Sequence, residues 1–279
     1  MRKEKKLTAA QNRQLILNKN TPFTVLEAYK TLRTNLMFSL AGKGCKKILI
    51  TSAMPGEGKT TTAINLGKVF AMNGEKVLLV DCDLRLSTTS AKLSICNTPG
   101  LSDVLVGMRE LSEVIQHMED GLDVLTAGNI PPNPSELLGS ESMQILMALL
   151  ENSYKYIILD APPIAAVTDA TVISSLASGT VIVVRSGVAD RDTVGISIER
   201  LRLAGAKLLG FVYISPDEER KGYEKSYGYY GYGERARRSS KSGCYASGTR
   251  TSVKASHKAV QPTKRSGRSM EKRFRERQR

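Results

Sequence analysis

The segment AMPGEGKTT, residues 53–61, has the residue types and spacing of a phosphate-binding loop. Gly56 and Gly58 allow backbone amides to turn inward around phosphate oxygens, and a helix that starts directly afterwards adds the partial positive charge of its amino terminus. Lys59 can reach β- and γ-phosphates, and the Thr60 hydroxyl suits Mg²⁺. The segment therefore predicts a site for ATP and Mg²⁺, with the binding residues Pro55, Gly56, Glu57, Gly58, Lys59, Thr60 and Thr61.

An alternative explanation of this segment is a plain glycine turn followed by an exposed lysine. Ala53 stands where the phosphate-loop pattern usually has a glycine, so the match is incomplete. The segment nevertheless lies between an apolar run, residues 47–52, and a helical stretch, which is the context that the pattern requires. This context favours the nucleotide site.

Aspartates follow two further apolar runs. VLLVDCDLR contains Asp81 and Asp83, and YIILDAPP contains Asp160. A single Asp after a strand is often a helix cap, whereas three at two strand ends beside a phosphate loop match the oxygen ligands that Mg²⁺·ATP needs. We assign Asp83 and Asp160, with Thr60, to the metal or its waters. Asp81 is the candidate to accept a proton from an incoming hydroxyl or to orient it, and Lys59 completes the predicted catalytic set.

Half of the ten tyrosines lie in the short stretch YEKSYGYYGY, residues 223–232. Their neighbours are Gly, Ser, Lys and Glu, so there is no periodic apolar face against which aromatic rings could pack. A low-complexity tail is the alternative explanation. Because the same chain has a predicted phosphoryl donor site, we interpret the hydroxyls as phosphate acceptors, namely Tyr223, Tyr227, Tyr229, Tyr230 and Tyr232.

Six short apolar runs must position these side chains. They lie near residues 47–52, 76–81, 122–127, 156–160, 180–186 and 208–214, with helical segments between them. Strands this apolar are covered on both faces, which predicts an α/β fold with a doubly wound, mostly parallel sheet. Ligands of such folds bind beyond the carboxyl ends of the strands, which brings together the loops after Ser52, Val80 and Leu159. An amphipathic helix from Thr24, with Glu27 at capping-box spacing, precedes the sheet.

Charge is distributed unevenly along the 279 residues. The net charge is +14, and residues 234–279 contribute +12 of it, from fifteen Lys or Arg against three Glu. Such a segment has too few apolar residues to offset its ordering entropy, but it attracts polyanions: anionic lipid, nucleic acid or acidic segments of a partner. The expected division is a flexible basic amino terminus (1–20), a P-loop domain (21–215), a tyrosine-rich segment (216–233) and a basic disordered tail (234–279).

Cysteines and apolar runs limit the cellular context. The four cysteines are widely spaced with no CxxC pair, which favours reduced thiols in a cytosol over a zinc site or a disulfide framework. The basic amino-terminal residues lack the apolar core of a signal peptide, and no eighteen apolar residues run together. We therefore expect any membrane association to be peripheral or to depend on a partner.

Taken together, the AMPGEGKT loop, the VLLVDCDLR and YIILDAPP strands and the YEKSYGYYGYG tail resemble the bacterial protein-tyrosine kinases that control capsule and exopolysaccharide synthesis. VLLVDCDLR matches that family's additional Walker motif, an apolar run followed by DxDxR. EAYKTLRTNLMFS before the sheet and LTAGNIPPNPSELL, residues 125–138, match as well. The resemblance spans about residues 21–233.

The resemblance implies a kinase of P-loop NTPase type that transfers the γ-phosphoryl group of ATP to protein tyrosines, including its own carboxy-terminal cluster in trans. It also implies a membrane adaptor of the chain-length-regulator class, which would hold a cytoplasmic subunit at the inner face of the membrane. A ring-shaped homo-oligomer is implied through a helix with the pattern ExxRxxR, here Glu27, Lys30 and Arg33. Lys30 departs from this pattern, because lysine cannot make the planar bidentate contact of arginine. The long basic extension after residue 233 is a second departure.

Two other classes of protein remain to be weighed. ATP-driven partitioning or septum-positioning switches share the fold, but they carry a signature lysine where this chain has Met54, and they lack a tyrosine cluster. Nucleic acid is therefore not the expected partner. A binding module with a purely structural ATP site is disfavoured by the complete set of Lys59, Thr60 and the three aspartates.

Overall fold

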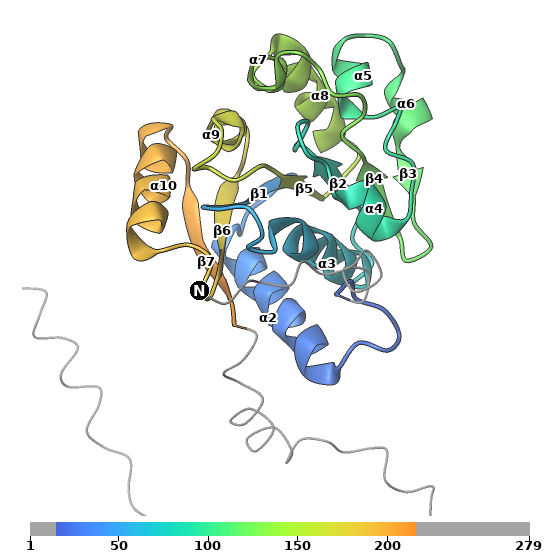
Figure 1. Ribbon diagram of the computed structural model, residues 1–279. Coiled ribbons are helices and arrows are strands. Elements are labelled where there is room, and N and C mark those ends of the chain that lie inside the picture. The colour runs from blue at the N-terminus through green and yellow to red at the C-terminus, as the bar shows by residue number, and fades with distance from the viewer. Residues whose placement is uncertain (1–14, 216–279) are drawn as a thin grey trace, which may run out of the picture. The chain divides into compact units, whose positions relative to one another are not determined.

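The computed structural model describes residues 15–215, and the tyrosine-rich segment and basic tail lie outside this range. Its strands form one seven-stranded sheet in the order β3-β4-β2-β5-β1-β6-β7 (Figure 1). Every pairing is parallel except that of β3 with β4. The strands are β1 (Lys46–Ser52), β2 (Val77–Asp81), β3 (Gln116–His117), β4 (Leu122–Leu125), β5 (Tyr156–Asp160), β6 (Gly179–Arg185) and β7 (Leu208–Ile214).

Helices cover both faces of the sheet, as predicted from the apolar runs (Figure 1). They are α2 (Phe23–Ser39), α3 (Lys59–Ala71), α4 (Thr89–Leu93), α5 (Leu101–Leu105), α6 (Leu111–Val114), α7 (Pro134–Leu138), α8 (Glu141–Glu151), α9 (Asp169–Ser174) and α10 (Arg191–Leu203). Within residues 15–215, none is long and apolar enough to cross a membrane.

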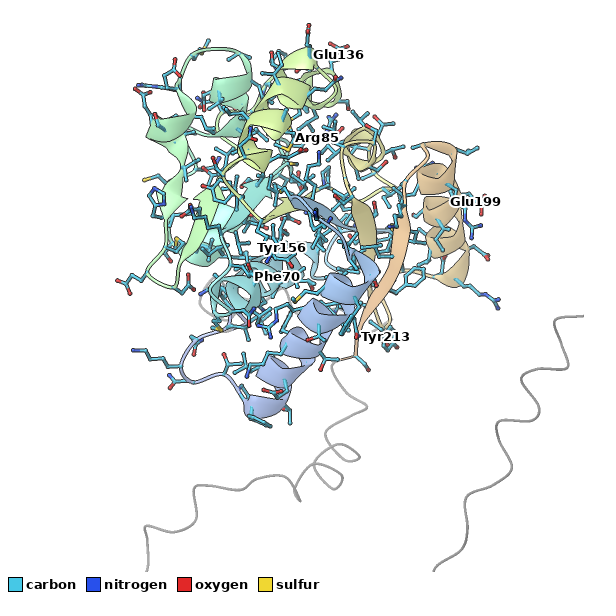
Figure 2. All side chains as sticks on the ribbon, turned by 180° about the vertical axis from the view of Figure 1, so that it is seen from behind. Phe70, Arg85, Glu136, Tyr156, Glu199 and Tyr213 are labelled. Atoms are coloured by element: carbon cyan, nitrogen blue, oxygen red, sulfur yellow. The ribbon has the colours of Figure 1, made fainter. Side chains whose placement is uncertain are left out.

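Two apolar cores, one on each face, make the sheet doubly wound. In β1, Ile48 and Ile50 join the core beneath α2 and α3, whereas Leu49 joins the core beneath α8, α9 and α10. Successive side chains of a strand point to opposite faces, so a strand that is apolar throughout contributes to both cores. On the α3 face, the ring of Phe70 stacks on that of Tyr156, with 4.0 Å between centroids (Figure 2).

The amino-terminal boundary of the folded unit differs from the expectation. Ile16 and Leu17 are buried against α3, so residues 15–20 belong to the folded unit rather than to a flexible terminus. The Asn65 side chain holds them: its Oδ1 accepts from Leu17 N at 2.9 Å, and its Nδ2 donates to Leu15 O at 2.9 Å. The predicted capping box is also absent, because α2 begins at Phe23 with no side-chain cap.

Replacing Asn65 with alanine should destabilise the protein. The substitution leaves the Leu17 amide without its acceptor in a buried place, which costs about 1–3 kcal/mol. Urea unfolding would measure this, with Asn152→Ala as the control, since Asn152 makes one exposed bond to Ala148 O. Equal unfolding midpoints for the two variants would contradict the assignment of residues 15–17 to the core.

Candidate active site

The phosphate-loop segment forms the turn between β1 and α3. Gly56 and Gly58 have φ angles of +85° and +92°, a backbone conformation that residues with a Cβ rarely adopt. Gly58 is the residue directly before α3. Because these two turns direct the loop back over the amino terminus of α3, backbone N–H groups are available there for an anion. Pro55 and Gly56 are exposed at the tip of the loop, Thr61 is half-buried, and Thr60 is buried.

The Glu57 side chain stabilises the phosphate loop through hydrogen bonds to the backbone. Its side chain is fully buried, and its carboxylate accepts hydrogen bonds from Met54 N at 2.7 Å and Arg185 N at 3.3 Å. These bonds tie the loop to itself and to the end of β6. The carboxylate is thus committed to the protein backbone, so a contact of Glu57 with phosphate is left to its own N–H group.

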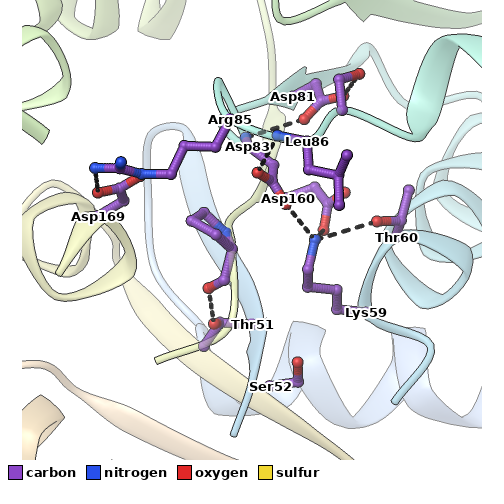
Figure 3. Close-up of polar contacts among 12 residues, drawn as sticks. Thr51, Ser52, Lys59, Thr60, Asp81, Asp83, Arg85, Leu86, Asp160 and Asp169 are labelled. Carbon is purple, nitrogen blue, oxygen red and sulfur yellow. Dashed lines mark hydrogen bonds and ion pairs between the residues drawn. The ribbon is translucent and has the colours of Figure 1, made fainter. Parts of the chain in front are cut away.

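Lys59 points toward the carboxylates at the ends of β2 and β5 (Figure 3). Its Nζ lies 3.0 Å from Asp83 Oδ2 and 3.9 Å from Asp160 Oδ1. Burial by itself lowers the pKa of Lys59, but the nearby carboxylates of Asp160 and Asp83 outweigh it and the pKa is raised. Lys59 is therefore a firmly protonated cation, and we assign its ion pair to Asp83 because that contact is the shorter one.

Asp160 is buried at the end of β5, in register with Asp81 on the neighbouring strand. Neither of its carboxylate oxygens has a hydrogen-bond partner among residues 15–215. Burial raises the pKa of Asp160 to about 7, although Lys59 and the nearby Thr60 hydroxyl work in the opposite direction. A buried carboxyl without donors is costly, and a metal-bound water supplies such donors.

The raised pKa makes the contribution of Asp160 to stability depend on pH. The folded chain keeps this carboxyl protonated up to about pH 7, whereas the unfolded chain releases the proton near 3.8. Its contribution is therefore complete below pH 3.8 and is lost as pH rises through 7. Without nucleotide, the wild-type protein should lose stability relative to Asp160→Asn by about 1–4 kcal/mol over this window. Urea titrations of both proteins at several pH values test this, and a constant difference would contradict it.

Asp81 is fully buried, and both of its oxygens accept hydrogen bonds. Oδ1 accepts from Asp83 N at 3.0 Å, and Oδ2 accepts from Ser87 Oγ at 2.6 Å. Burial raises the pKa of Asp81, and the Ser87 hydroxyl lowers it in part. Ser87 was not among the predicted site residues, since a serine four positions after Asp83 has no recognisable spacing signal. The structure therefore adds Ser87 to the site as the residue that holds Asp81.

Lys92 is a second residue that the sequence did not indicate. It belongs to α4 and is partly buried. Burial lowers the pKa of Lys92, the charge of Asp160 raises it in part, and the charge of Lys59 lowers it further. Its ammonium thus adds positive charge close to the phosphate loop. A lone lysine in a short helix gives no pattern from which this place could be inferred.

These residues fit Mg²⁺ and a nucleotide. Among residues 15–215, no three His, Cys, Asp or Glu side chains are arranged to hold a metal alone. Mg²⁺ in nucleotide sites takes most of its ligands from phosphate oxygens and waters, so few protein ligands are required. The Thr60 hydroxyl and the carboxylates of Asp83 and Asp160 are the groups available for it.

The ring-forming residues expected on α2 have partners within the same chain. Lys30 Nζ pairs with Glu27 Oε1 at 2.8 Å, and Arg33 Nη1 donates to Val69 O at 2.7 Å. Glu27 and Lys30 remain about two-fifths exposed. These two side chains are accessible to another subunit, whereas Arg33 is turned toward α3.

Fold and site together define a P-loop NTPase, and comparison with known proteins identifies its family. A family model described as an AAA domain matches residues 45–197. Tyrosine-protein kinase YwqD of Bacillus subtilis is 42% identical over 206 residues, which are 74% of this chain and 86% of YwqD. The chain belongs to the bacterial tyrosine-protein kinases.

Tyrosine-protein kinase etk of Escherichia coli is 37% identical over 210 residues, but the matched region is 72% of this chain and only 29% of etk. The solved kinase domain of Escherichia coli ETK superposes with a TM-score of 0.67 at 35% identity and covers 72% of this chain and 84% of that domain. The chain therefore corresponds to the kinase domain of the longer relative.

Proposed function

We propose that this chain is an ATP-dependent protein-tyrosine kinase that phosphorylates its own carboxy-terminal tyrosine cluster in trans and regulates capsular or exopolysaccharide synthesis and export. The observation that carries the proposal is the meeting of Lys59 with Asp83 and Asp160 at the end of a glycine loop. The kinase family of the chain supports the choice of tyrosine as the acceptor. The acceptors Tyr223, Tyr227, Tyr229, Tyr230 and Tyr232 lie outside the described residues.

In the proposed reaction, a phenol oxygen attacks the γ-phosphorus of ATP, the bond from that phosphorus to the bridging oxygen breaks, and ADP leaves. When bound, Mg²⁺ offsets the charge of the phosphates. Lys59 would leave Asp83 and contact the β- and γ-phosphates, and Thr60, Asp83 and Asp160 would hold the metal or its waters. Asp81 accepts or orients the phenol proton, which requires Ser87 to share or release its hydrogen bond.

Assembly and location follow from the same proposal. Transfer in trans needs at least two copies, and the partly exposed Glu27 and Lys30 of α2 are the proposed contacts of a ring. Arg33 would have to leave Val69 O to take part. We further propose a membrane adaptor of the chain-length-regulator class, which would place the kinase in the cytoplasm at the inner face of the membrane, and protein tyrosines of other partners as substrates.

Mass spectrometry of the purified full chain after incubation with ATP and Mg²⁺ tests the proposed function. We expect phosphate on tyrosines of residues 223–232. Release of free phosphate without phosphotyrosine would instead indicate an ATP-driven switch, and neither product would indicate a binding module. Mixing a heavier, inactive Lys59→Met chain with the active chain tests transfer in trans, because phosphate must then appear on the heavier chain.

The basic tail gives phosphorylation a proposed effect on an anionic lipid surface. Each phosphate adds about −1.5 to −2 charges at neutral pH, so phosphorylation of the cluster would offset much of the adjacent positive charge. We expect phosphorylated protein to sediment less with vesicles that contain phosphatidylglycerol than unphosphorylated protein does. Equal sedimentation of the two forms would rule out this charge switch.

A further inference from the structure

Three loops at the carboxyl edge of the sheet meet at the guanidinium of Arg85. Arg85 Nε lies 2.8 Å from Asp169 Oδ2, and its Nη2 lies 3.1 Å from Asp169 Oδ1 (Figure 3). Ser135 Oγ donates to Asp169 Oδ1 at 2.5 Å and accepts from Arg85 Nη2 at 3.0 Å. We call Arg85, Ser135 and Asp169 the loop clamp. It joins the loop after β2, the start of α7 and the start of α9.

The loop clamp differs from an ordinary surface ion pair. Arg85 is 39% exposed, but Asp169 is fully buried, and the two parallel N–H···O bonds of a planar guanidinium fix both distance and orientation. An exposed pair contributes little because solvent screens it, but a buried carboxylate that loses its partner is left uncompensated. Removing either side of the clamp should therefore displace the loops that it joins.

Two residues of the loop clamp, Arg85 and Asp169, lie on the loops that carry the active-site carboxylates Asp83 and Asp160. Arg85 follows Asp83 by two residues. Both belong to the turn of residues 83–86, in which Leu86 N donates to Asp83 Oδ1 at 3.0 Å. Asp169 lies at the end of the segment that starts at Asp160, and that segment is anchored by the bond from Thr51 Oγ1 to Pro162 O at 2.8 Å. The clamp thus closes a bridge between the loops of Asp83 and Asp160 on two neighbouring strands.

We propose that the loop clamp sets the spacing of Asp83 and Asp160 for one Mg²⁺, so that Arg85, Ser135 and Asp169 are positioning residues of the active site. The inference rests on the proposed function for the identity of the metal and the nucleotide. The clamp touches neither the phosphate loop nor Lys59, so binding of nucleotide without metal does not depend on it. Loss of the clamp weakens the metal-dependent part of binding.

Fluorescence titration with a labelled ADP, once with Mg²⁺ and once with excess chelator, tests this on the full chain. For Asp169→Asn and Arg85→Gln we expect a half-saturating Mg²⁺ concentration raised about tenfold, with metal-free ADP binding unchanged. Ser135→Ala, which keeps the ion pair, should give a smaller rise. The double variant Arg85→Gln/Asp169→Asn should be no worse than either single variant, because the two residues act as a unit.

Arg202→Gln is the matched control, since Arg202 pairs with Glu199 in an exposed place on α10. An unchanged Mg²⁺ requirement in the clamp variants would overturn the proposal. Equal losses of metal-free and metal-dependent binding would also overturn it, because they indicate a merely structural role. If Asp169→Asn does not fold, Arg85→Lys and Ser135→Ala decide by the same criterion. The readout does not involve tyrosine phosphorylation, so failure of the clamp is distinguishable from failure of the proposed kinase activity.

Discussion

Replacing Lys59 with methionine is expected to lower phosphotyrosine formation by about 10²–10³-fold or more, because the variant lacks the cation that contacts the transferred phosphoryl group. The side chain of methionine is similar in length, so the loop itself should persist. The substitution also leaves Asp83 without its ion-pair partner at 3.0 Å. Quantitative mass spectrometry of residues 223–232 after incubation with ATP and Mg²⁺ measures the effect.

Lys155→Met is the matched control for this prediction. Lys155 lies just before β5, at the amino end of that strand, is 56% exposed, and pairs with Glu75 at 3.1 Å. We expect its phosphotyrosine yield to match that of the wild type. Comparable yields from Lys59→Met and the wild type would remove Lys59 from the proposed mechanism.

Asp81→Asn is expected to abolish phosphoryl transfer while nucleotide binding is retained. Asparagine has the shape of aspartate but cannot accept the phenol proton. Asp81 is not among the residues assigned to the phosphates or to Mg²⁺, so nucleotide binding should be little affected. Transfer should fall by about 10²–10⁴-fold, the range typical of losing a general base. The rate of tyrosine phosphorylation and the affinity for labelled ADP are measured on the same preparation.

Ser87→Ala tests the same role of Asp81 without removing its carboxyl group. The Ser87 hydroxyl lowers the pKa of Asp81, so its removal should raise that pKa and move the acidic limb of the pH–rate profile to higher pH. Ser90→Ala, on the following helix, is a suitable control because no hydrogen bond to Asp81 involves its side chain. An unshifted acidic limb in Ser87→Ala, or full transfer by Asp81→Asn, would show that Asp81 is not the base.

The nearness of the candidate site residues was predictable because each lies directly after an apolar run that the sequence marks as a strand. The glycine loop, the strand before it and the helix after it are contiguous, and the apolar runs before Asp81 and Asp160 place these residues at the ends of parallel strands. The rule that the carboxyl ends of parallel strands share one edge then brings the loops together. The apolar runs and the glycine-loop motif were therefore sufficient to predict which loops lie close together.

The remaining contacts could not be predicted because they join residues far apart in the chain. Asn65 binds residues 15–17, Ser135 and Asp169 bind Arg85, and Arg185 N binds Glu57. No local pattern marks any of these pairs, since each arises only after the sheet has formed. The capping box at Thr24 shows the reverse case, in which a local pattern was present but the N-cap of α2 is Pro22, two positions before Thr24.

A crystal structure of the full chain with Mg²⁺ and a non-hydrolysable ATP analogue is the most direct test of the central claim. The account predicts that Lys59 Nζ leaves Asp83, now 3.0 Å away, and contacts the terminal phosphates, while Asp83 and Asp160 face one metal ion. An analogue bound elsewhere, or a Lys59 that keeps its ion pair beside an empty loop, would contradict the account.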